Sequence, residues 1–227
     1  MEHMKISVVI PTMNEEESIG EVMDEINEAL SGRDYEVLIV DTESTDRTRE
    51  IARSKGARVV EEPRRGYGRA YKTGFEEAEG DIIVTLDADC TYPASRIPDL
   101  VVMIEKEGYE FITTDRLSNI SSDVMSWSHR FGNWLLKTTM NLLFRMDLND
   151  SQSGMWVFKR SALRHLNVTS DGMPFSEEIK IEAVKKGLKL DEVPIDYRKR
   201  KGEAKIRSLK DGFKNLTFLW KKRFGLV

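Results

Sequence analysis

Two aspartates follow directly after an apolar run near the middle of the chain. The run, Ile82-Ile83-Val84-Thr85-Leu86, predicts a buried strand and leads into Asp87-Ala88-Asp89. A turn at the end of the strand lets both carboxylates reach one cation. Carboxylate oxygens suit Mg²⁺ or Mn²⁺, which complete an octahedron with phosphate oxygens. We therefore predict a metal site here, and the alternative is a plain acidic loop.

Polar residues also stand at the ends of two earlier predicted strands, over residues 5–10 and 35–40. They are Asn14, Glu15 and Asp41. In parallel sheets, ligands bind beyond the carboxyl ends of the strands. These three residues and the two aspartates therefore form one candidate site.

The elements that must position this site alternate along the first half of the chain. Strand patterns cover residues 5–10, 35–40, 57–60, 81–86 and 109–114, and helical patterns lie between them over 19–30, 45–55, 70–78 and 95–106. This alternation predicts an α/β fold with a mostly parallel central sheet and helices on both faces. Asn14 with Glu17 resembles a capping box at the start of the first helix.

The second half is less regular. It begins with a long apolar helix over residues 124–146, followed by a strand over 154–158, a helix over 176–186 and a strand over 190–195.

Other chemistries find little support. Gly66 and Gly68 do not form a dinucleotide fingerprint, because Tyr71 occupies the third glycine position. The three histidines are scattered and lack metal-ligand spacing. The single cysteine, Cys90, excludes a disulfide framework and fits a reducing compartment.

Composition predicts one globular domain with an unusual tail. The chain has 227 residues, 40% of them hydrophobic, and a net charge of −4. Between residues 198 and 223, eleven Lys/Arg face two acids, so this segment carries +9 and the remainder −13. We predict a domain over residues 1–204 and a basic amphipathic tail over 205–227 that meets phosphates or a membrane surface. The acidic body argues against nucleic acid, and we expect a cytoplasmic protein without a membrane-spanning segment.

The motifs, taken together and in this order, resemble the family 2 glycosyltransferases with the GT-A fold. The segments that carry the resemblance are Val8 to Glu15, Leu38 to Asp41 with Ser44-Thr45-Asp46, and Leu86 to Asp89. Two later segments are similar to the dolichyl-phosphate mannose and glucose synthases: Asp150-Ser151-Gln152-Ser153-Gly154, and Val193 to Tyr197 with Arg200 and Lys205. The resemblance covers about residues 6–205.

The resemblance implies a role for each matching position. Binding of the nucleotide-sugar is implied for Pro11, Asn14, Glu15, Asp41, Asp87 and Ala88. Metal binding is implied for Asp87, Asp89 and Thr91. The acceptor phosphate would be held by Arg116 and Arg130, and the diphosphate or acceptor by Arg200 and Lys205. Two positions depart from the family pattern: Thr42 replaces a second acid, and Ala204 replaces a serine.

The resemblance leads us to predict an inverting transferase. It would move a hexose, mannose or glucose, from a GDP- or UDP-sugar to a polyprenyl or dolichyl phosphate, with Mg²⁺ or Mn²⁺. A phosphate acceptor is already ionised and needs positioning rather than a base. A sugar-hydroxyl acceptor, the first alternative, would need a carboxylate such as Asp150 or Glu178, unless these orient basic neighbours. The second alternative is an inactive nucleotide-sugar-binding module.

A lipid acceptor also gives the long helix a second interpretation. It is either a core helix or a surface element on lipid, with Trp127 and Trp134 at the interface and Arg130 and Lys137 one heptad apart. We favour the surface element, and expect peripheral association with the cytoplasmic face of a membrane.

Overall fold

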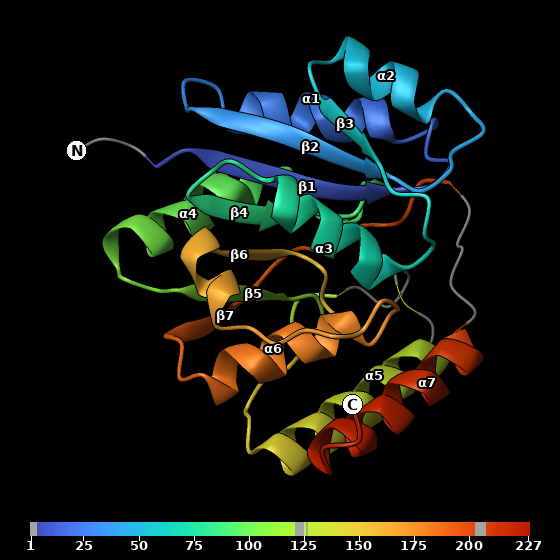
Figure 1. The fold of residues 1–227 in the computed structure, drawn as a ribbon, viewed down its shortest axis with the longest axis vertical. Helices are drawn as coiled ribbons and strands as arrows, with labels where there is room; N and C mark the ends of the chain where they lie inside the picture. Colours follow the sequence, from blue (N-terminus) through green and yellow to red (C-terminus); the bar gives the residue numbers. More distant parts are fainter. Residues whose placement is uncertain (1–3, 121–124, 126, 203–207) are drawn as a thin grey trace.

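The centre of the protein is one mixed sheet of seven strands in the order β3-β2-β1-β4-β6-β5-β7. The computed structural model describes residues 4–120, 125, 127–202 and 208–227 (Figure 1). The strands are β1 (Ile6–Thr12), β2 (Tyr35–Asp41), β3 (Arg58–Glu61), β4 (Ile82–Thr85), β5 (Phe111–Asp115), β6 (Trp156–Lys159) and β7 (Leu190–Pro194). β6 runs antiparallel to β4 and β5, and the other neighbouring pairs are parallel. The predicted mostly parallel sheet is confirmed.

Helices cover both faces of this sheet, because successive residues of a strand point to opposite sides. In β1, Val8 and Ile10 pack into one core and Val9 into the other. The first core is closed by α1 (Ile19–Ala29), α2 (Thr48–Ser54) and α4 (Ile97–Lys106), and the second by α3 (Tyr67–Glu77) and α6 (Phe175–Lys185). Two short 3₁₀ helices, Ala94–Arg96 and Arg160–Arg164, complete these layers.

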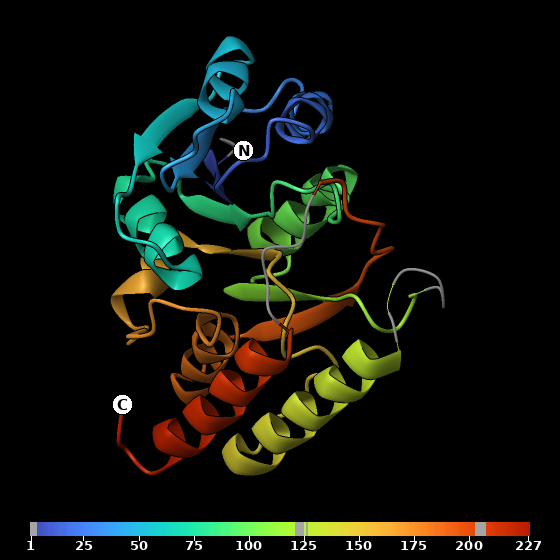
Figure 2. The same cartoon turned by 90° about the vertical axis from the view of Figure 1, so that its right-hand side faces the viewer.

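Two further helices, α5 (Trp127–Phe144) and α7 (Ser208–Arg223), lie side by side beyond α6 (Figures 1 and 2). A third apolar cluster joins them to α6 through Met140, Ile181 and Leu219. The predicted basic tail therefore includes a helix with one packed face. Its predicted boundary between residues 204 and 205 lies outside the described residues.

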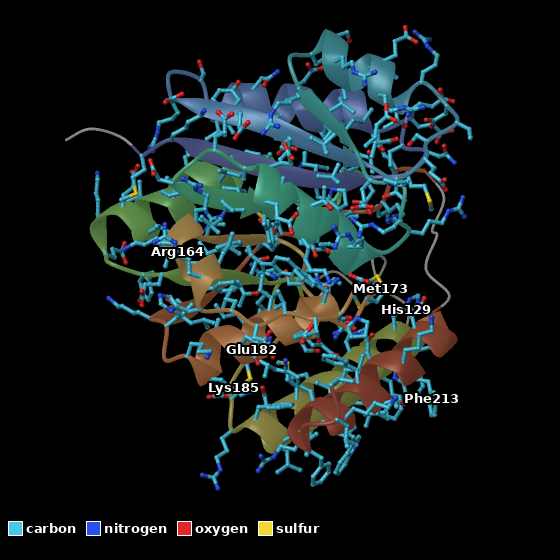
Figure 3. All side chains as sticks on the ribbon, in the orientation of Figure 1. His129, Arg164, Met173, Glu182, Lys185 and Phe213 are labelled. Carbon is cyan, nitrogen blue, oxygen red and sulfur yellow. The ribbon has the colours of Figure 1, made fainter. Side chains whose placement is uncertain are left out.

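α7 is held to α6 by a buried charge cluster. The Lys222 side chain is 4% exposed, and its Nζ lies 2.8 Å from Glu178 Oε1 and 3.2 Å from Glu182 Oε1. Glu182, which is labelled in Figure 3, belongs to α6 and contacts Lys222 of α7. One lysine of the basic run is therefore an internal anchor.

α5 is a surface helix. It buries Leu136 and Met140, whereas Trp127, Phe131 and Trp134 are 79%, 51% and 53% exposed. These three aromatic rings stack in succession, with 5.8 Å between neighbouring centroids. The helix is therefore not a core helix, and its contact with lipid stays a prediction. Within the described ranges, none of the helices is long and apolar enough to cross a membrane.

Replacing Lys222 by methionine should lower the free energy of unfolding by about 3 kcal/mol, because Glu178 would keep a buried charge without its cation and Glu182 would keep only Lys185. The matched control is Lys221→Met, since Lys221 is exposed and its loss should change stability by less than about 0.5 kcal/mol. Urea unfolding followed by circular dichroism measures both variants. Equal stabilities would show that this ion cluster does not hold α7.

Candidate active site

The loops after β1 and β2 are joined at the carboxyl edge of the sheet. Asn14 Oδ1 accepts a hydrogen bond of 2.8 Å from the Thr45 N–H, and the Asn14 N–H donates to Ser44 Oγ at 2.8 Å. Asn14 has a positive φ of 54°, and α1 begins only at Ile19. The predicted capping box is therefore wrong, because the Asn14 side chain holds the neighbouring loop instead of starting the helix.

Asp41 is buried beneath these loops. Its Oδ2 accepts hydrogen bonds from Thr12 Oγ1 at 2.9 Å and Ser44 Oγ at 2.5 Å, and Arg49 Nε lies 3.6 Å from its Oδ1. Thr42 is buried too, and its N–H donates to the Thr12 carbonyl at 2.8 Å. An acid at position 42 would add a second charge to this dry turn, so threonine suits it. Asp41 fixes Ser44 in the loop after β2, and its own side chain is fully buried.

Asp89 is held by partners on both sides. Its Oδ1 accepts hydrogen bonds from the Thr91 N–H at 3.1 Å and from Thr91 Oγ1 at 2.6 Å. Its Oδ2 accepts from Arg200 Nε at 2.7 Å, and Arg200 Nη2 lies 2.5 Å away. The Thr91 hydroxyl, predicted to contact a metal, orients the Asp89 carboxylate in this structure.

The chain segment after β7 brings Arg200 to this strand end. The Arg198 N–H donates to the Thr91 carbonyl at 3.0 Å, and the Lys201 N–H donates to the Asp89 carbonyl at 2.9 Å. Two backbone bonds thus fix residues 198–201 beside Asp89. Because this pairing is between distant parts of the chain, no local pattern in the sequence indicates it.

The remaining predicted donor-side residues lie around this edge. Pro11 is partly exposed near the end of β1, and a Cβ atom added to Gly202 would lie 3.8 Å from Glu15 Oε2. Ala88 is 3% exposed and packs in the first core, so its side chain is not available to a nucleotide. Lys205 lies outside the described residues.

Asp87 differs from Asp89 in its proton affinity. Its Oδ1 accepts a hydrogen bond of 3.3 Å from the Tyr67 hydroxyl. Burial raises the pKa of Asp87 to about 7, the charge of Asp89 raises it as well, and Arg200 and Arg116 act in the opposite direction. Near neutral pH this edge therefore holds one carboxylate paired with arginine and one that is readily protonated.

A divalent cation fits these two carboxylates. It would relieve their mutual repulsion, and Mg²⁺ in proteins is commonly held by one or two carboxylates with water and substrate phosphates. Among the residues that the structure describes, no group of three or more His, Cys, Asp or Glu could hold a metal. The other ligands would therefore come from a bound substrate or from water.

Arg116 and Asp150 form a buried ion pair at the end of β5. Asp150 Oδ2 accepts from Arg116 Nε at 2.6 Å, and Asp150 Oδ1 accepts from Nη2 at 2.9 Å. Burial alone would raise the pKa of Asp150, but the charge and hydrogen bonds of Arg116 lower it to about 2. Lys180 Nζ donates to the Asp150 carbonyl at 2.9 Å, and the Asp150 N–H donates to Glu192 Oε1 at 2.9 Å. Asp150 therefore orients Arg116.

Tyr197, from a segment that carries the resemblance, and Tyr92, which the sequence did not single out, pack beside the Arg116–Asp150 pair. The Tyr92 hydroxyl accepts a hydrogen bond of 2.7 Å from the Gly154 N–H, and Tyr92 packs edge-on against Tyr197 with 5.2 Å between ring centroids. The Arg116 guanidinium lies 5.2 Å from the centroid of Tyr197. A Cβ atom at Gly154 would lie 2.3 Å from the Tyr67 hydroxyl, so this glycine leaves room for the partner of Asp87. No spacing rule indicates such contacts.

Arg130 lies beside this ion pair. It lines a cavity of about 200 Å³ together with Leu117, Ile120, Trp134, Lys137 and Asn149. Lys137 Nζ donates to Asn149 Oδ1 at 3.0 Å. Since Leu117 follows Arg116 and Asn149 precedes Asp150, the cavity adjoins the ion pair. It combines two basic side chains with apolar walls.

Glu178, predicted as a possible acceptor-orienting carboxylate, serves a different purpose. It is fully buried and accepts hydrogen bonds from the N–H groups of Thr169 at 3.0 Å and Ser170 at 2.8 Å, besides pairing with Lys222. All of these partners belong to the packing of α6 and α7. Of the two alternatives for Glu178, the structure shows the orientation of a basic neighbour, because its carboxylate is committed to Lys222 and the anchor of α7.

The chain is similar in sequence to known glycosyltransferases. The model of Glycosyl transferase family 2 matches residues 7–166. A low-salt glycan biosynthesis hexosyltransferase of Haloferax volcanii is 37% identical over 217 residues, which cover 94% of this chain and 52% of that protein. The dolichyl-phosphate hexose transferase of the same organism is 35% identical over 201 residues, 88% of this chain and 86% of that protein. The chain thus spans about half the length of the first relative.

A solved structure agrees with the fold. Glucosyl-3-phosphoglycerate synthase from Mycobacterium tuberculosis, in complex with Mn²⁺, UDP-glucose and phosphoglyceric acid, superimposes with a TM-score of 0.78. The sequences are 25% identical, and the alignment covers 98% of this chain and 80% of that one.

The Asp87 carboxyl should titrate near pH 7, and replacing Asp89 by asparagine should lower that pKa without returning it to about 3.9, because burial remains. A carboxyl whose pKa rises on folding binds more protons when folded, so its contribution to stability should fall as pH rises from about 4 to about 7. Carbon NMR of aspartate-labelled protein measures the titration, and Asp87→Asn assigns the signal. A titration near pH 4 would contradict the prediction.

Proposed function

The chain belongs to glycosyl transferase family 2 and has the GT-A fold, and from this premise we propose that it transfers a hexose from a nucleotide-sugar to a polyprenyl phosphate of the dolichyl type. The observation that carries the proposal is the cavity lined by Arg130, Lys137 and apolar side chains beside the buried Arg116–Asp150 pair. A basic site with apolar walls suits a phosphate attached to a hydrocarbon chain. The name of the Haloferax dolichyl-phosphate hexose transferase supports the same acceptor.

We assign the donor to the edge formed by Asn14, Glu15, Asp87, Asp89 and Arg200. Asp87 and Asp89 would hold Mg²⁺ or Mn²⁺, which supplies charge stabilisation for the departing diphosphate when bound. The Mycobacterium complex with Mn²⁺ and UDP-glucose supports this choice of ion. Arg200, already paired with Asp89, brings a fixed positive charge to the same place.

The acceptor half needs no general base. A phosphate monoester is ionised near neutral pH, so one of its oxygens can attack the anomeric carbon directly while the bond to the diphosphate breaks. This single displacement inverts the configuration. The Asp150 carboxylate is occupied by the Arg116 guanidinium and the Gln152 N–H, which agrees with a site built for positioning.

We further propose that α5 and α7 rest on the membrane that contains the acceptor. Ten large apolar residues are exposed in the described part of the chain, and all lie on α5, on α7 or in the C-terminal residues after it. Figure 3 shows Phe213 projecting outward from α7, and Lys221 and Arg223 are exposed on the same helix. Apolar surface combined with basic residues is typical of interfacial helices. The single cysteine, buried and unpaired, supports a cytoplasmic location.

Replacing Arg130 by alanine should raise the KM for polyprenyl phosphate about tenfold to a hundredfold and change the donor KM little, because one charge-assisted contact to phosphate is lost. The matched control is Arg145→Ala, an exposed arginine just after the same helix. Transfer is followed by mass spectrometry with UDP-glucose and GDP-mannose, and Asp89→Asn is the variant expected to be inactive.

Each alternative predicts a different outcome of this assay. Transfer to phosphoglyceric acid, but none to polyprenyl phosphate, would favour a soluble acceptor. No metal-dependent turnover of either donor would favour an inactive binding module. A donor-only defect in Arg130→Ala would place the acceptor phosphate elsewhere.

The protein should sediment with anionic vesicles, partly in a salt-sensitive way, since basic residues near such a surface contribute about 1 kcal/mol each before screening. Lys221→Gln with Arg223→Gln should reduce the salt-sensitive part, and Phe213→Ser with Trp220→Ser the remainder. Lys222 stays, because it anchors α7. Arg47→Gln with Arg53→Gln, exposed on the loop and helix at α2, is the control. Wild-type protein that stays in solution at low salt would refute membrane docking.

A further inference from the structure

A side-chain amide links the C-terminal helix to the ion pair at the acceptor site. Gln152 lies in the loop that leads into β6. Its Nε2 donates to Glu177 Oε1 of α6 at 2.7 Å, and its Oε1 accepts from Asn215 Nδ2 of α7 at 2.8 Å. One half-buried glutamine thus bonds two helices that are far from it in the sequence.

Both partners of this amide are buried. Glu177 is 0% and Asn215 3% exposed. Within the described residues, the second carboxylate oxygen of Glu177, Oε2, and the amide oxygen of Asn215, Oδ1, have no hydrogen-bond partner. Apolar side chains would pack α6 against α7 without this cost, as Ile181 and Leu219 do nearby. Packing alone therefore does not explain the three polar groups.

Gln152 also contacts the Arg116–Asp150 ion pair through its backbone. The Gln152 N–H donates to Asp150 Oδ1 at 2.9 Å, and that oxygen also accepts from Arg116 Nη2 at 2.9 Å. A displacement of Gln152 would therefore change the environment of the carboxylate that orients Arg116. Three hydrogen bonds in series connect Asn215 on α7 to this guanidinium.

α7 also carries the exposed Phe213 and Trp220 on its other side. Because a helix is rigid over a few turns, a displacement caused by contacts on one face also moves the residues on the other face.

We propose that Gln152 is a positioning residue for the acceptor site, and that through Asn215 it makes the orientation of Arg116 depend on the docking of α7. This inference rests on the proposed function, since it assigns the acceptor to the Arg116 side. An enzyme that uses a lipid acceptor would thereby be most competent when α7 lies against the membrane that contains that acceptor. Gln152 acts on Arg116 through Asp150 and does not itself touch substrate.

The test compares Asn215→Leu with Thr217→Val. Asn215→Leu keeps an apolar contact for packing and removes the bond to Gln152. Thr217→Val is the matched control, because the Thr217 hydroxyl donates only within α7, to the Phe213 carbonyl at 2.8 Å. Gln152→Met is the second variant, in case Asn215→Leu disturbs α7. Circular dichroism and hydrogen exchange in β1 show whether each variant is folded.

Two measurements decide the proposal. In Asn215→Leu and Gln152→Met, hydrogen exchange should accelerate in residues 149–153, and the KM for polyprenyl phosphate should rise about fivefold to tenfold while the donor KM stays within about twofold. Thr217→Val should match the wild type in both. Unchanged exchange in residues 149–153 with faster exchange in α7 alone would overturn the coupling. Equal rises in both KM values would overturn the positioning role.

The exchange experiment is independent of the acceptor. If wild-type protein fails to use polyprenyl phosphate, the proposed function fails, and exchange still decides whether Asn215 and residues 149–153 are coupled.

Discussion

The buried pair of Arg116 and Asp150 is the interaction on which the second half of the protein is built. Removing two charges from water is costly unless geometry and further hydrogen bonds compensate. Here the two charges bond each other twice and the Asp150 carboxylate also accepts from the Gln152 N–H, while Glu192 on β7 and Lys180 on α6 hold the backbone of Asp150 in place. β5, β7 and α6 must therefore meet at one point, which fixes the loop before β6. It also fixes the buried guanidinium of Arg116, whereas the side chain of Arg130 is exposed.

The site divides into two electrostatic halves along one edge of the sheet. On the proposed donor side, Asp89 is paired with Arg200, and burial raises the pKa of Asp87 to about 7, so an added cation would stabilise the two carboxylates. On the proposed acceptor side, the carboxylate of Asp150 is paired with Arg116, and a nearby cavity is lined by Arg130 and Lys137. Tyr197 lies against the guanidinium of Arg116.

The sequence predicted what depends on periodicity and strand ends. All seven strands and the helices between them were expected within a few residues, because their apolar patterns are strong. The position of Asp87 and Asp89 just after a strand was predicted for the same reason. What could not be predicted depends on contacts between distant segments: the antiparallel β6 between β4 and β5, the pairing of residues 198–201 with the strand end, and the role of Glu178. Asn14 shows the limit clearly, since its capping pattern is local and its actual partner, Thr45, lies on another loop.

The basic tail shows that the number of charged residues in a segment does not tell how many of them are exposed. The segment contains three consecutive basic residues, Lys221, Lys222 and Arg223, which the sequence alone does not distinguish as buried or exposed. On a helix they point in different directions, and Lys222 is turned inward to Glu178 and Glu182 while its neighbours face solvent. The same helix turns Asn215 and Leu219 inward and Phe213 and Trp220 outward. α7 therefore packs one face against α6 and exposes aromatic side chains on the opposite face, and a single rigid element carries both.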